Sequence, residues 1–140
     1  MNVLFVCKWN QGRSQIAEAL FSKYTKKYTC VSCGTHADES SPITLATYAP
    51  QIVRVLKEVG IDVSDKTTTK MTKELFKNAD LVVVLNDNDD LPDYARNSNK
   101  VVLWKIEDPD GRDYQYHVTM RDQIDTRVKD LLCSLEVANK

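Results

Sequence analysis

The sequence predicts an α/β fold in which a parallel sheet lies between two layers of helices. Strand-like and helix-like segments alternate along the 140 residues, an order that favours a parallel sheet with right-handed crossovers. The strand candidates are short, nearly unbroken apolar runs, as expected where helices cover both faces of a sheet. The length is that of one domain, and we expect residues 1–140 to form it.

The elements can be assigned in order along the chain. The first strand candidate, residues 2–6, is followed by a loop and an amphipathic helix that begins near Ser14. The predicted strands are residues 2–6, 29–32, 81–85 and 101–106, and the later predicted helices surround residues 52–59, 73–77 and 117–135. Gly60 is expected to terminate the second helix in a left-handed cap. Residues 35–48 are rich in Ser, Thr and Asp and are expected to be a long, mobile loop.

Composition limits the possible partners and compartments. The formal net charge is −1, from 19 basic and 20 acidic side chains, so no global field favours nucleic acid or a membrane surface. The sequence contains no apolar run of about 20 residues that would span a bilayer. Four cysteines are too few for a disulfide framework in a chain of this size, and we expect a cytoplasmic protein in a reducing compartment.

The segment between Cys7 and Arg13 is the main candidate for chemistry. A loop of this length, Lys8-Trp9-Asn10-Gln11-Gly12-Arg13-Ser14 after the cysteine, can turn its backbone N–H groups inward around an oxyanion, and the following helix adds its positive end. The same N–H groups favour a Cys7 thiolate, which is the nucleophilic form. Arg13 can bridge two oxygens of the anion. Asn10 is expected to hold the loop through side-chain hydrogen bonds, and Ser14 to cap the helix or donate to the thiolate.

A proton donor for the leaving group is expected in the acidic turn after the last strand. Asp108 precedes Pro109, which favours an extended conformation at the aspartate and stiffens the turn. We therefore predict that Cys7 attacks phosphorus while Asp108 protonates the departing oxygen. Asp108 would then activate water to hydrolyse the thiophosphoryl intermediate. This scheme requires neither a metal nor a cofactor.

Other reactive side chains have simpler interpretations. Cys30 and Cys33 form a CxxC pair, but a strand would direct them to opposite faces, and two ligands are too few for zinc. Small buried side chains are expected for both, with Cys33 a lesser candidate for trapping an oxidised Cys7, and Cys133 is assigned to packing. His117 is expected at the surface where the last helix begins. The acidic run Asp87-Asn88-Asp89-Asp90 is assigned to a solvated loop, and His36 and Lys8 are either near the site mouth or simply solvated.

The segment FVCKWNQGRSQIAEAL resembles the loop and first helix of the low molecular weight protein tyrosine phosphatase and arsenate reductase superfamily. Most of the chain follows in the order typical of that family: SCGTHADESSP, VLKEVGIDVSDKTT, NADLVVVLN, WKIEDPDG and RDQIDTRVKDL. The resemblance implies a four-stranded parallel sheet, with Cys7 as nucleophile, Arg13 as oxyanion clamp and Asp108 as acid and base. It also implies that Ser32 braces Asn10.

The branch within the superfamily is left open by the sequence. Gln15, the Gly34-Thr35-His36 turn and the closing Arg121-Asp122 pair resemble arsenate reductases. Thioredoxin-coupled members, however, carry two further cysteines after the third strand, and residues 85–91 contain none. An external thiol, from glutaredoxin, thioredoxin or a small molecule, would then be the reductant.

Other features differ from those that are common in the tyrosine phosphatase branch. The pair of tyrosines common after Asp-Pro in tyrosine phosphatases is replaced by Asp110-Gly111, with Tyr114 and Tyr116 slightly later. Trp9 stands where a small residue is usual, so its ring can stack on an aryl group or obstruct bulky substrates. Gly12 replaces a cysteine that is common in tyrosine phosphatases.

Three functions are therefore carried forward. The leading interpretation is hydrolysis of phosphomonoesters by a phosphatase of the low molecular weight type. The alternative is reduction of arsenate with an external thiol. The third is a noncatalytic module that binds an oxyanion.

Overall fold

The computed structural model describes residues 1–38 and 41–138, and the predicted α/β architecture is confirmed. Four strands form one sheet in the order β2-β1-β3-β4, and all three pairings are parallel. The strands are β1 (Asn2–Cys7), β2 (Thr29–Gly34), β3 (Leu81–Val84) and β4 (Val101–Leu103). The helices are α1 (Arg13–Tyr24), α2 (Leu45–Tyr48), α3 (Pro50–Lys57), α4 (Lys73–Asn78) and α5 (Tyr114–Ala138), with a 3-10 turn η1 at Asn88–Asp90.

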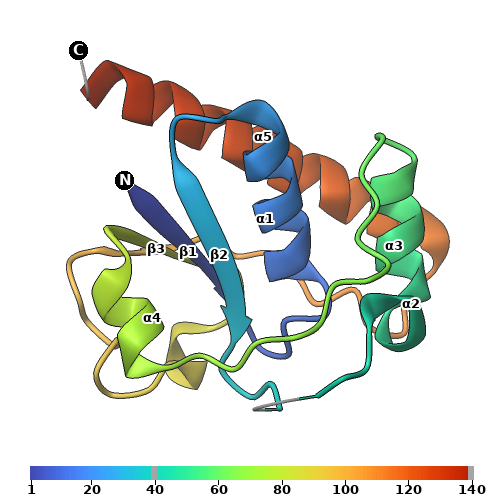
Figure 1. Ribbon diagram of the computed structural model, residues 1–140, viewed down its shortest axis with the longest axis horizontal. Coiled ribbons are helices and arrows are strands. Elements are labelled where there is room, and N and C mark those ends of the chain that lie inside the picture. Colours follow the sequence, from blue (N-terminus) through green and yellow to red (C-terminus); the bar gives the residue numbers. More distant parts are fainter. Residues whose placement is uncertain (39–40, 139–140) are drawn as a thin grey trace.

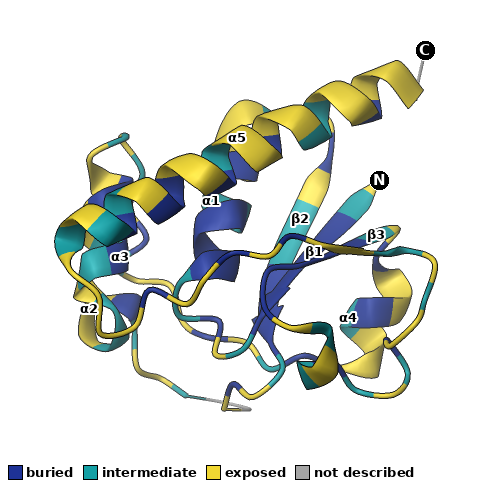
Figure 2. Ribbon diagram, turned by 180° about the vertical axis from the view of Figure 1, so that it is seen from behind, coloured by how far each residue is buried: buried dark blue, intermediate teal, exposed yellow. Residues whose placement is uncertain are grey.

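Alternate residues of β1 separate the core into two layers. Val3 and Phe5 pack with α1, α3 and α5, whereas Leu4 and Val6 pack with α4. Figures 1 and 2 accordingly show α1, α3 and α5 on one side of the sheet and α4 on the other. The sheet is thus the middle of three layers, as the apolar strands predicted.

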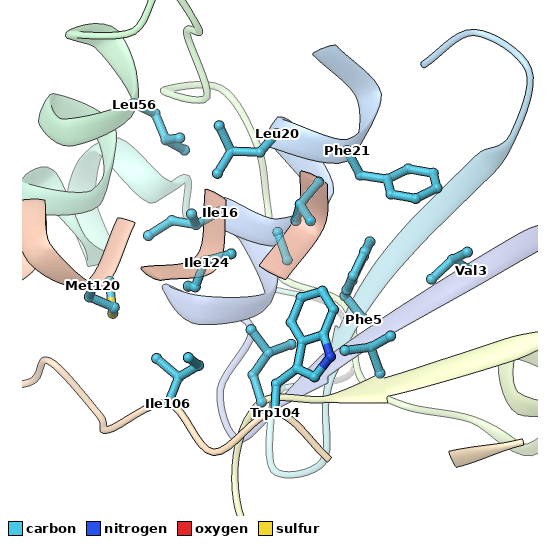
Figure 3. Close-up of a cluster of buried hydrophobic side chains, with 14 of the residues drawn as sticks. Val3, Phe5, Ile16, Leu20, Phe21, Leu56, Trp104, Ile106, Met120 and Ile124 are labelled. Atoms are coloured by element: carbon cyan, nitrogen blue, oxygen red, sulfur yellow. The ribbon is translucent and has the colours of Figure 1, made fainter. Parts of the chain in front are cut away.

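Aromatic rings fill the larger core layer. Phe5 packs edge-on against Phe21 of α1, with ring centroids 5.6 Å apart, and lies 6.0 Å from Trp104. Figure 3 shows these rings beside Ile16 and Leu20 of α1 and Met120 and Ile124 of α5. This layer fixes α1, and with it the loop that precedes the helix, against the sheet.

The sheet order places a switch point at the end of β1. From β1 the chain first adds β2 on one side and later β3 on the other. The carboxyl end of the strand where the direction of winding reverses is the usual ligand site in an open parallel sheet. Cys7 is the last residue of β1, so the predicted loop begins at this point.

Two segments differ from the sequence predictions. The segment 35–48 is not a loop throughout, because α2 closes it: Leu45 is fully buried, and Thr44 pairs with Thr67. Residues 39–40 of that predicted loop lie outside the described residues. The predicted strand 101–106 is shorter than expected and ends at Leu103. Trp104 still donates its N–H to the Val84 carbonyl at 2.8 Å, after which the chain leaves the sheet.

A polar network joins α5 to α3. Arg121 of α5 donates to the Val55 carbonyl at 2.8 Å and to Glu58 at 3.1 Å. Tyr114 donates to the same carboxylate. These two donors hold the pKa of Glu58 below its ordinary value. The network therefore ties together α3 and the start of α5, which both line the cleft described below.

Among the described residues, no helix combines the length and the apolar character needed to cross a membrane.

Gly60 has φ +84°, and the N–H of Ile61 bonds to the Leu56 carbonyl at 3.0 Å. This is the left-handed termination predicted for the helix that precedes it.

Candidate active site

The loop from Cys7 to Ser14 connects β1 to the first turn of α1. The Cys7 side chain is buried, and its Sγ lies 2.9 Å from Oγ of Ser14, which is fully buried. A hydroxyl at this distance can donate a hydrogen bond to a thiolate. The structure therefore places the candidate nucleophile beside a hydroxyl donor, close to the N-terminus of α1.

Asn10 holds the loop from its centre. Its φ is +57°, a left-handed conformation that asparagine tolerates better than most residues. Its Nδ2 donates to Ser14 Oγ at 2.8 Å and to Ser32 Oγ at 3.0 Å, and its Oδ1 accepts from Thr69 N at 2.9 Å. The structure thus brings Asn10, Ser14 and Ser32 together as the sequence predicted.

Two further residues support the loop and were not singled out for that purpose in the sequence. Gln15 is buried, and its Nε2 lies within hydrogen-bond distance of the Asn10 carbonyl (3.2 Å), Asn10 Oδ1 (3.1 Å) and the Thr67 carbonyl (3.2 Å). Gly34 lies directly beneath the loop, where an added Cβ would be 2.7 Å from Asn10 N. Neither role has a local sequence signal, because each depends on segments that are distant in the chain.

Arg13 is held in place by two backbone carbonyls that follow β3 and β4. One of its terminal nitrogens, Nη1, donates to the carbonyls of Leu85 at 3.2 Å and Ile106 at 2.8 Å. The side chain is buried, and Nη2 lies 3.8 Å from Oδ2 of Asp108. The guanidinium is therefore fixed before an anion arrives, and its remaining N–H groups are left to bind one.

Asp108 lies at the mouth of the site. Its side chain is half exposed, and its Oδ1 accepts from Asp110 N at 3.0 Å, which closes the acidic turn predicted from the sequence. The contact between Asp108 and Arg13 joins two residues that are far apart in the sequence. The three residues predicted to act together, Cys7, Arg13 and Asp108, border one cleft.

The cleft has a volume of about 440 Å³, and we call it the Cys7 cleft. The residues that line it come from the loop, from α2 and the start of α3, and from the acidic turn with the start of α5. Its lining residues are Cys7, Trp9, Gln11, Gly12, Arg13, Tyr48, Ala49, Pro50, Gln51, Ile52, Asp108, Pro109, Asp110, Gly111, Arg112 and His117. The cleft is much larger than a tetrahedral oxyanion, so there is room for an organic group beyond it.

Trp9 forms part of the cleft rim. Its side chain is exposed, its ring centroid lies 5.9 Å from that of His36, and Lys8 Nζ lies 5.5 Å from it. His36 and Lys8 thus support the indole from outside the cleft. His36 itself borders a second depression beside Lys70, Tyr94 and Arg96.

His117 does not lie at the surface, contrary to the sequence prediction. The helix begins three residues earlier, at Tyr114, and His117 is 7% exposed and lines the Cys7 cleft. A signal was present, because His117 is seven residues before Ile124, and residues seven apart lie on the same helix face. The buried face of α5 therefore extends toward the N-terminus of the helix and includes the titratable side chain of His117.

The remaining cysteines are distributed away from the loop mouth. Cys33 is fully buried on the α4 side of the sheet, and burial, with a smaller contribution from Cys7, raises the pKa of its thiol. Cys30 is partly buried and packs on the opposite layer, so the strand does separate the CxxC pair. The packing role predicted for Cys133 is wrong, because this thiol is exposed. Within residues 1–38 and 41–138, no group of three or more His, Cys, Asp or Glu side chains is arranged to hold a metal.

A parallel α/β fold with a cysteine, an arginine and a carboxylate around a loop at the switch point defines a class of protein: one built for thiol attack on a tetrahedral oxyanion. Comparison with known proteins agrees with this class. The model of the low molecular weight phosphotyrosine protein phosphatase family matches residues 2–140. The chain belongs to this family, which confirms the resemblance predicted from its motifs.

Relatives from both branches are similar to this chain. An arsenate reductase of Brevibacillus brevis is 34% identical over 130 residues, covering 91% of this chain and 90% of that protein. A glutaredoxin arsenate reductase of Synechocystis is 32% identical over 136 residues, covering 95% and 97%. The solved structure of a low molecular weight protein tyrosine phosphatase from T. tengcongensis is 28% identical, with a TM-score of 0.82 over 96% of this chain and 99% of that one.

Proposed function

We propose that this protein is a cysteine-dependent phosphatase that hydrolyses phosphomonoesters, with residues 1–140 acting as one catalytic domain. The observation that carries the proposal is the Cys7 cleft, which is lined by the nucleophile, the clamp and the acid and is large enough for a leaving group as well. Family membership and the similarity to a solved tyrosine phosphatase support the same function.

The first chemical step is attack on phosphorus. The Cys7 thiolate forms a bond to phosphorus as the bond to the leaving oxygen breaks, and the protonated Asp108 carboxyl gives its proton to that oxygen. Arg13 and the loop N–H groups stabilise the negative charge on the three remaining oxygens. Because the Leu85 and Ile106 carbonyls already hold the guanidinium, little reorganisation is needed in the transition state.

The second step releases phosphate. The Asp108 carboxylate takes a proton from water, the water oxygen attacks phosphorus, and the phosphorus–sulfur bond breaks to regenerate the Cys7 thiolate. Ser14 Oγ, 2.9 Å from the sulfur, stabilises that thiolate as it departs. The half-exposed position of Asp108 gives water access to the site.

The alternative function is arsenate reduction, which the named relatives favour. Cys7 would bond to arsenic with loss of water, and an external thiol would then attack the Cys7 sulfur. The electron pair of the sulfur–arsenic bond would pass to arsenic and release arsenite. A second thiol of the reductant would resolve the mixed disulfide. An external thiol is invoked because residues 85–91, which follow β3, contain no cysteine that could relay the oxidation within the chain. The name of the Synechocystis relative makes glutaredoxin the first reductant to test.

One experiment separates the functions. Hydrolysis of p-nitrophenyl phosphate is measured for the wild type, Cys7→Ser and, as a matched control, Cys133→Ser, which alters an exposed thiol far along α5. The phosphatase proposal requires activity in the wild type and the control and its loss in Cys7→Ser.

Arsenite formation from arsenate is measured in parallel with glutaredoxin, thioredoxin or a small thiol. Thiol-dependent arsenite formation without ester hydrolysis would establish the alternative. Phosphate binding without either reaction would establish the noncatalytic module.

A further inference from the structure

The buried side chain of Gln15 makes hydrogen bonds through one end only. Its Nε2 lies 3.2 Å from the Asn10 carbonyl oxygen, 3.1 Å from Asn10 Oδ1 and 3.2 Å from the Thr67 carbonyl oxygen. Its Oε1 is buried and has no hydrogen-bond partner within the part of the chain that the structure describes. A buried acceptor without a partner costs free energy, so this arrangement calls for an explanation.

The surrounding groups fix which end of the Gln15 amide faces the loop. Carbonyl oxygens only accept hydrogen bonds, so the end that faces the Asn10 and Thr67 carbonyls must be the nitrogen. The opposite orientation would place the Gln15 oxygen among three other oxygens. The loop therefore receives a donor from Gln15, and Oε1 is left without a partner as the consequence.

The bond to the Asn10 carbonyl sets the direction of the next N–H group. None of the described peptide bonds is cis, and in a planar trans peptide the C=O of one residue and the N–H of the next point in opposite directions. Because the Asn10 carbonyl is directed at Gln15, the Gln11 N–H is directed away from it. Gln11 lines the Cys7 cleft, and among the described residues no backbone carbonyl accepts from its N–H.

We propose that Gln15 is a positioning residue for oxyanion binding: it holds the peptide between Asn10 and Gln11 so that the Gln11 N–H donates to the anion at Cys7. If this peptide turned over, the Asn10 carbonyl would face the anion, and an attraction would become a repulsion. Gln15 thus orients a donor before the anion arrives, which is the condition for strong electrostatic stabilisation. The inference rests on the oxyanion site of the function proposed above.

The first experiment removes the donor. Gln15→Met keeps an unbranched side chain of similar length but has no N–H group. The Kd for inorganic phosphate, measured by calorimetric titration without turnover, should rise about tenfold, as for one lost hydrogen bond to an anion. The kcat/KM for p-nitrophenyl phosphate should fall by about tenfold or more.

Two control variants separate position from general effects. Gln123→Met is the same chemical change at an exposed position on α5 and should leave both quantities unchanged. Val128→Ala removes buried side-chain volume from the core face of α5 and lowers stability away from the loop. Its phosphate affinity should also stay unchanged, so a weaker affinity in Gln15→Met is not explained by lower stability.

The second experiment observes the Gln11 N–H directly by NMR. In the wild type, saturating phosphate should move the Gln11 amide proton downfield, because a hydrogen bond to an anion deshields the proton. In Gln15→Met this shift should be lost at saturating phosphate. The amide proton of Arg13, which belongs to the first turn of α1, should still shift. A purely structural role of Gln15 would not single out one amide of the loop.

The outcomes are distinct. If the wild-type Gln11 amide does not respond to phosphate while the Arg13 amide does, the inference is wrong, whether or not the variant folds. An unchanged phosphate Kd in Gln15→Met also overturns it, while the oxyanion site and the phosphatase function stand. If the wild type does not bind phosphate, the oxyanion site itself fails, and the role of Gln15 fails with it.

Discussion

Replacing Gly34 with alanine should damage the active site without placing any new group in the cleft. A Cβ at this position would lie 2.7 Å from Asn10 N, 2.7 Å from the Trp9 carbonyl carbon and 2.8 Å from the Lys8 carbonyl oxygen. All three are backbone atoms of the loop between Cys7 and Ser14, so no side-chain rotation can relieve the contacts.

The loop has to yield, because Gly34 is held from behind. Its N–H bonds to the Thr69 carbonyl at 2.8 Å, and its carbonyl accepts from Met71 N at 3.0 Å. Reaching ordinary contact at 3.4 Å requires the loop to move by about 0.7 Å. A displacement of that size at a reacting group lowers kcat/KM by roughly 10- to 100-fold. Overpacking of this kind lowers the free energy of unfolding by about 1–3 kcal/mol.

The assay is hydrolysis of p-nitrophenyl phosphate together with urea denaturation. Gly60→Ala is the matched control, because Gly60 has φ +84° and no atom within 4 Å of an added Cβ. There the left-handed backbone should cost about 1 kcal/mol of stability, with kcat/KM unchanged. A Gly34→Ala enzyme with kcat/KM within about twofold of wild type would refute the steric argument.

Three further predictions address the acid, the loop brace and the buried thiol. Asp108→Asn should lower kcat/KM by about 10²-fold or more for substituted phenyl phosphates with poor leaving groups and far less for good ones; equal losses across the series would contradict the acid role. Ser32→Ala removes the 3.0 Å bond from Asn10 Nδ2 and should lower the free energy of unfolding by about 1 kcal/mol. The exposed Ser134→Ala should change it by less than about 0.5 kcal/mol in the same urea titration, and equal effects of the two variants would argue against the brace. Because burial raises the pKa of Cys33, the unfolded state releases the thiol proton first as pH rises above 9.0, the ordinary value. The free energy of unfolding should then fall above that pH with a slope of up to about 1.4 kcal/mol per pH unit. Cys33→Val should reduce this slope, and an identical slope in both proteins would show that Cys33 does not contribute.

Features encoded by neighbouring residues were predictable from the sequence. The apolar run of β1, the Cys7–Arg13 spacing and the start of α1 form one continuous segment, so the site could be assigned from local pattern alone. The same pattern on α5 was used incompletely. Counting back seven from Ile124 reaches the buried His117, whereas Cys133 is five residues after Val128 and falls off the buried face.

Features that depend on distant contacts were not predictable. Gln15 follows the loop directly, yet its role comes from the Thr67 carbonyl, 52 residues away. Arg13 contacts the Leu85 and Ile106 carbonyls only because the segments that follow β3 and β4 pass beside the loop. The lengths of β4 and α2 likewise depend on what packs against them, which local propensity does not specify.

By itself the sequence determined the layered α/β fold, the oxyanion loop and the family, because each depends on residue types at short spacings. Only the tertiary structure decided how the loop is held and what surrounds the substrate. Gly34 packs against the loop, the Leu85 and Ile106 carbonyls fix Arg13, and α5 turns His117 into the Cys7 cleft. The physical reason is that close approach and shared burial arise between segments far apart in the chain, and they exist only when the sheet and its two helical layers are assembled.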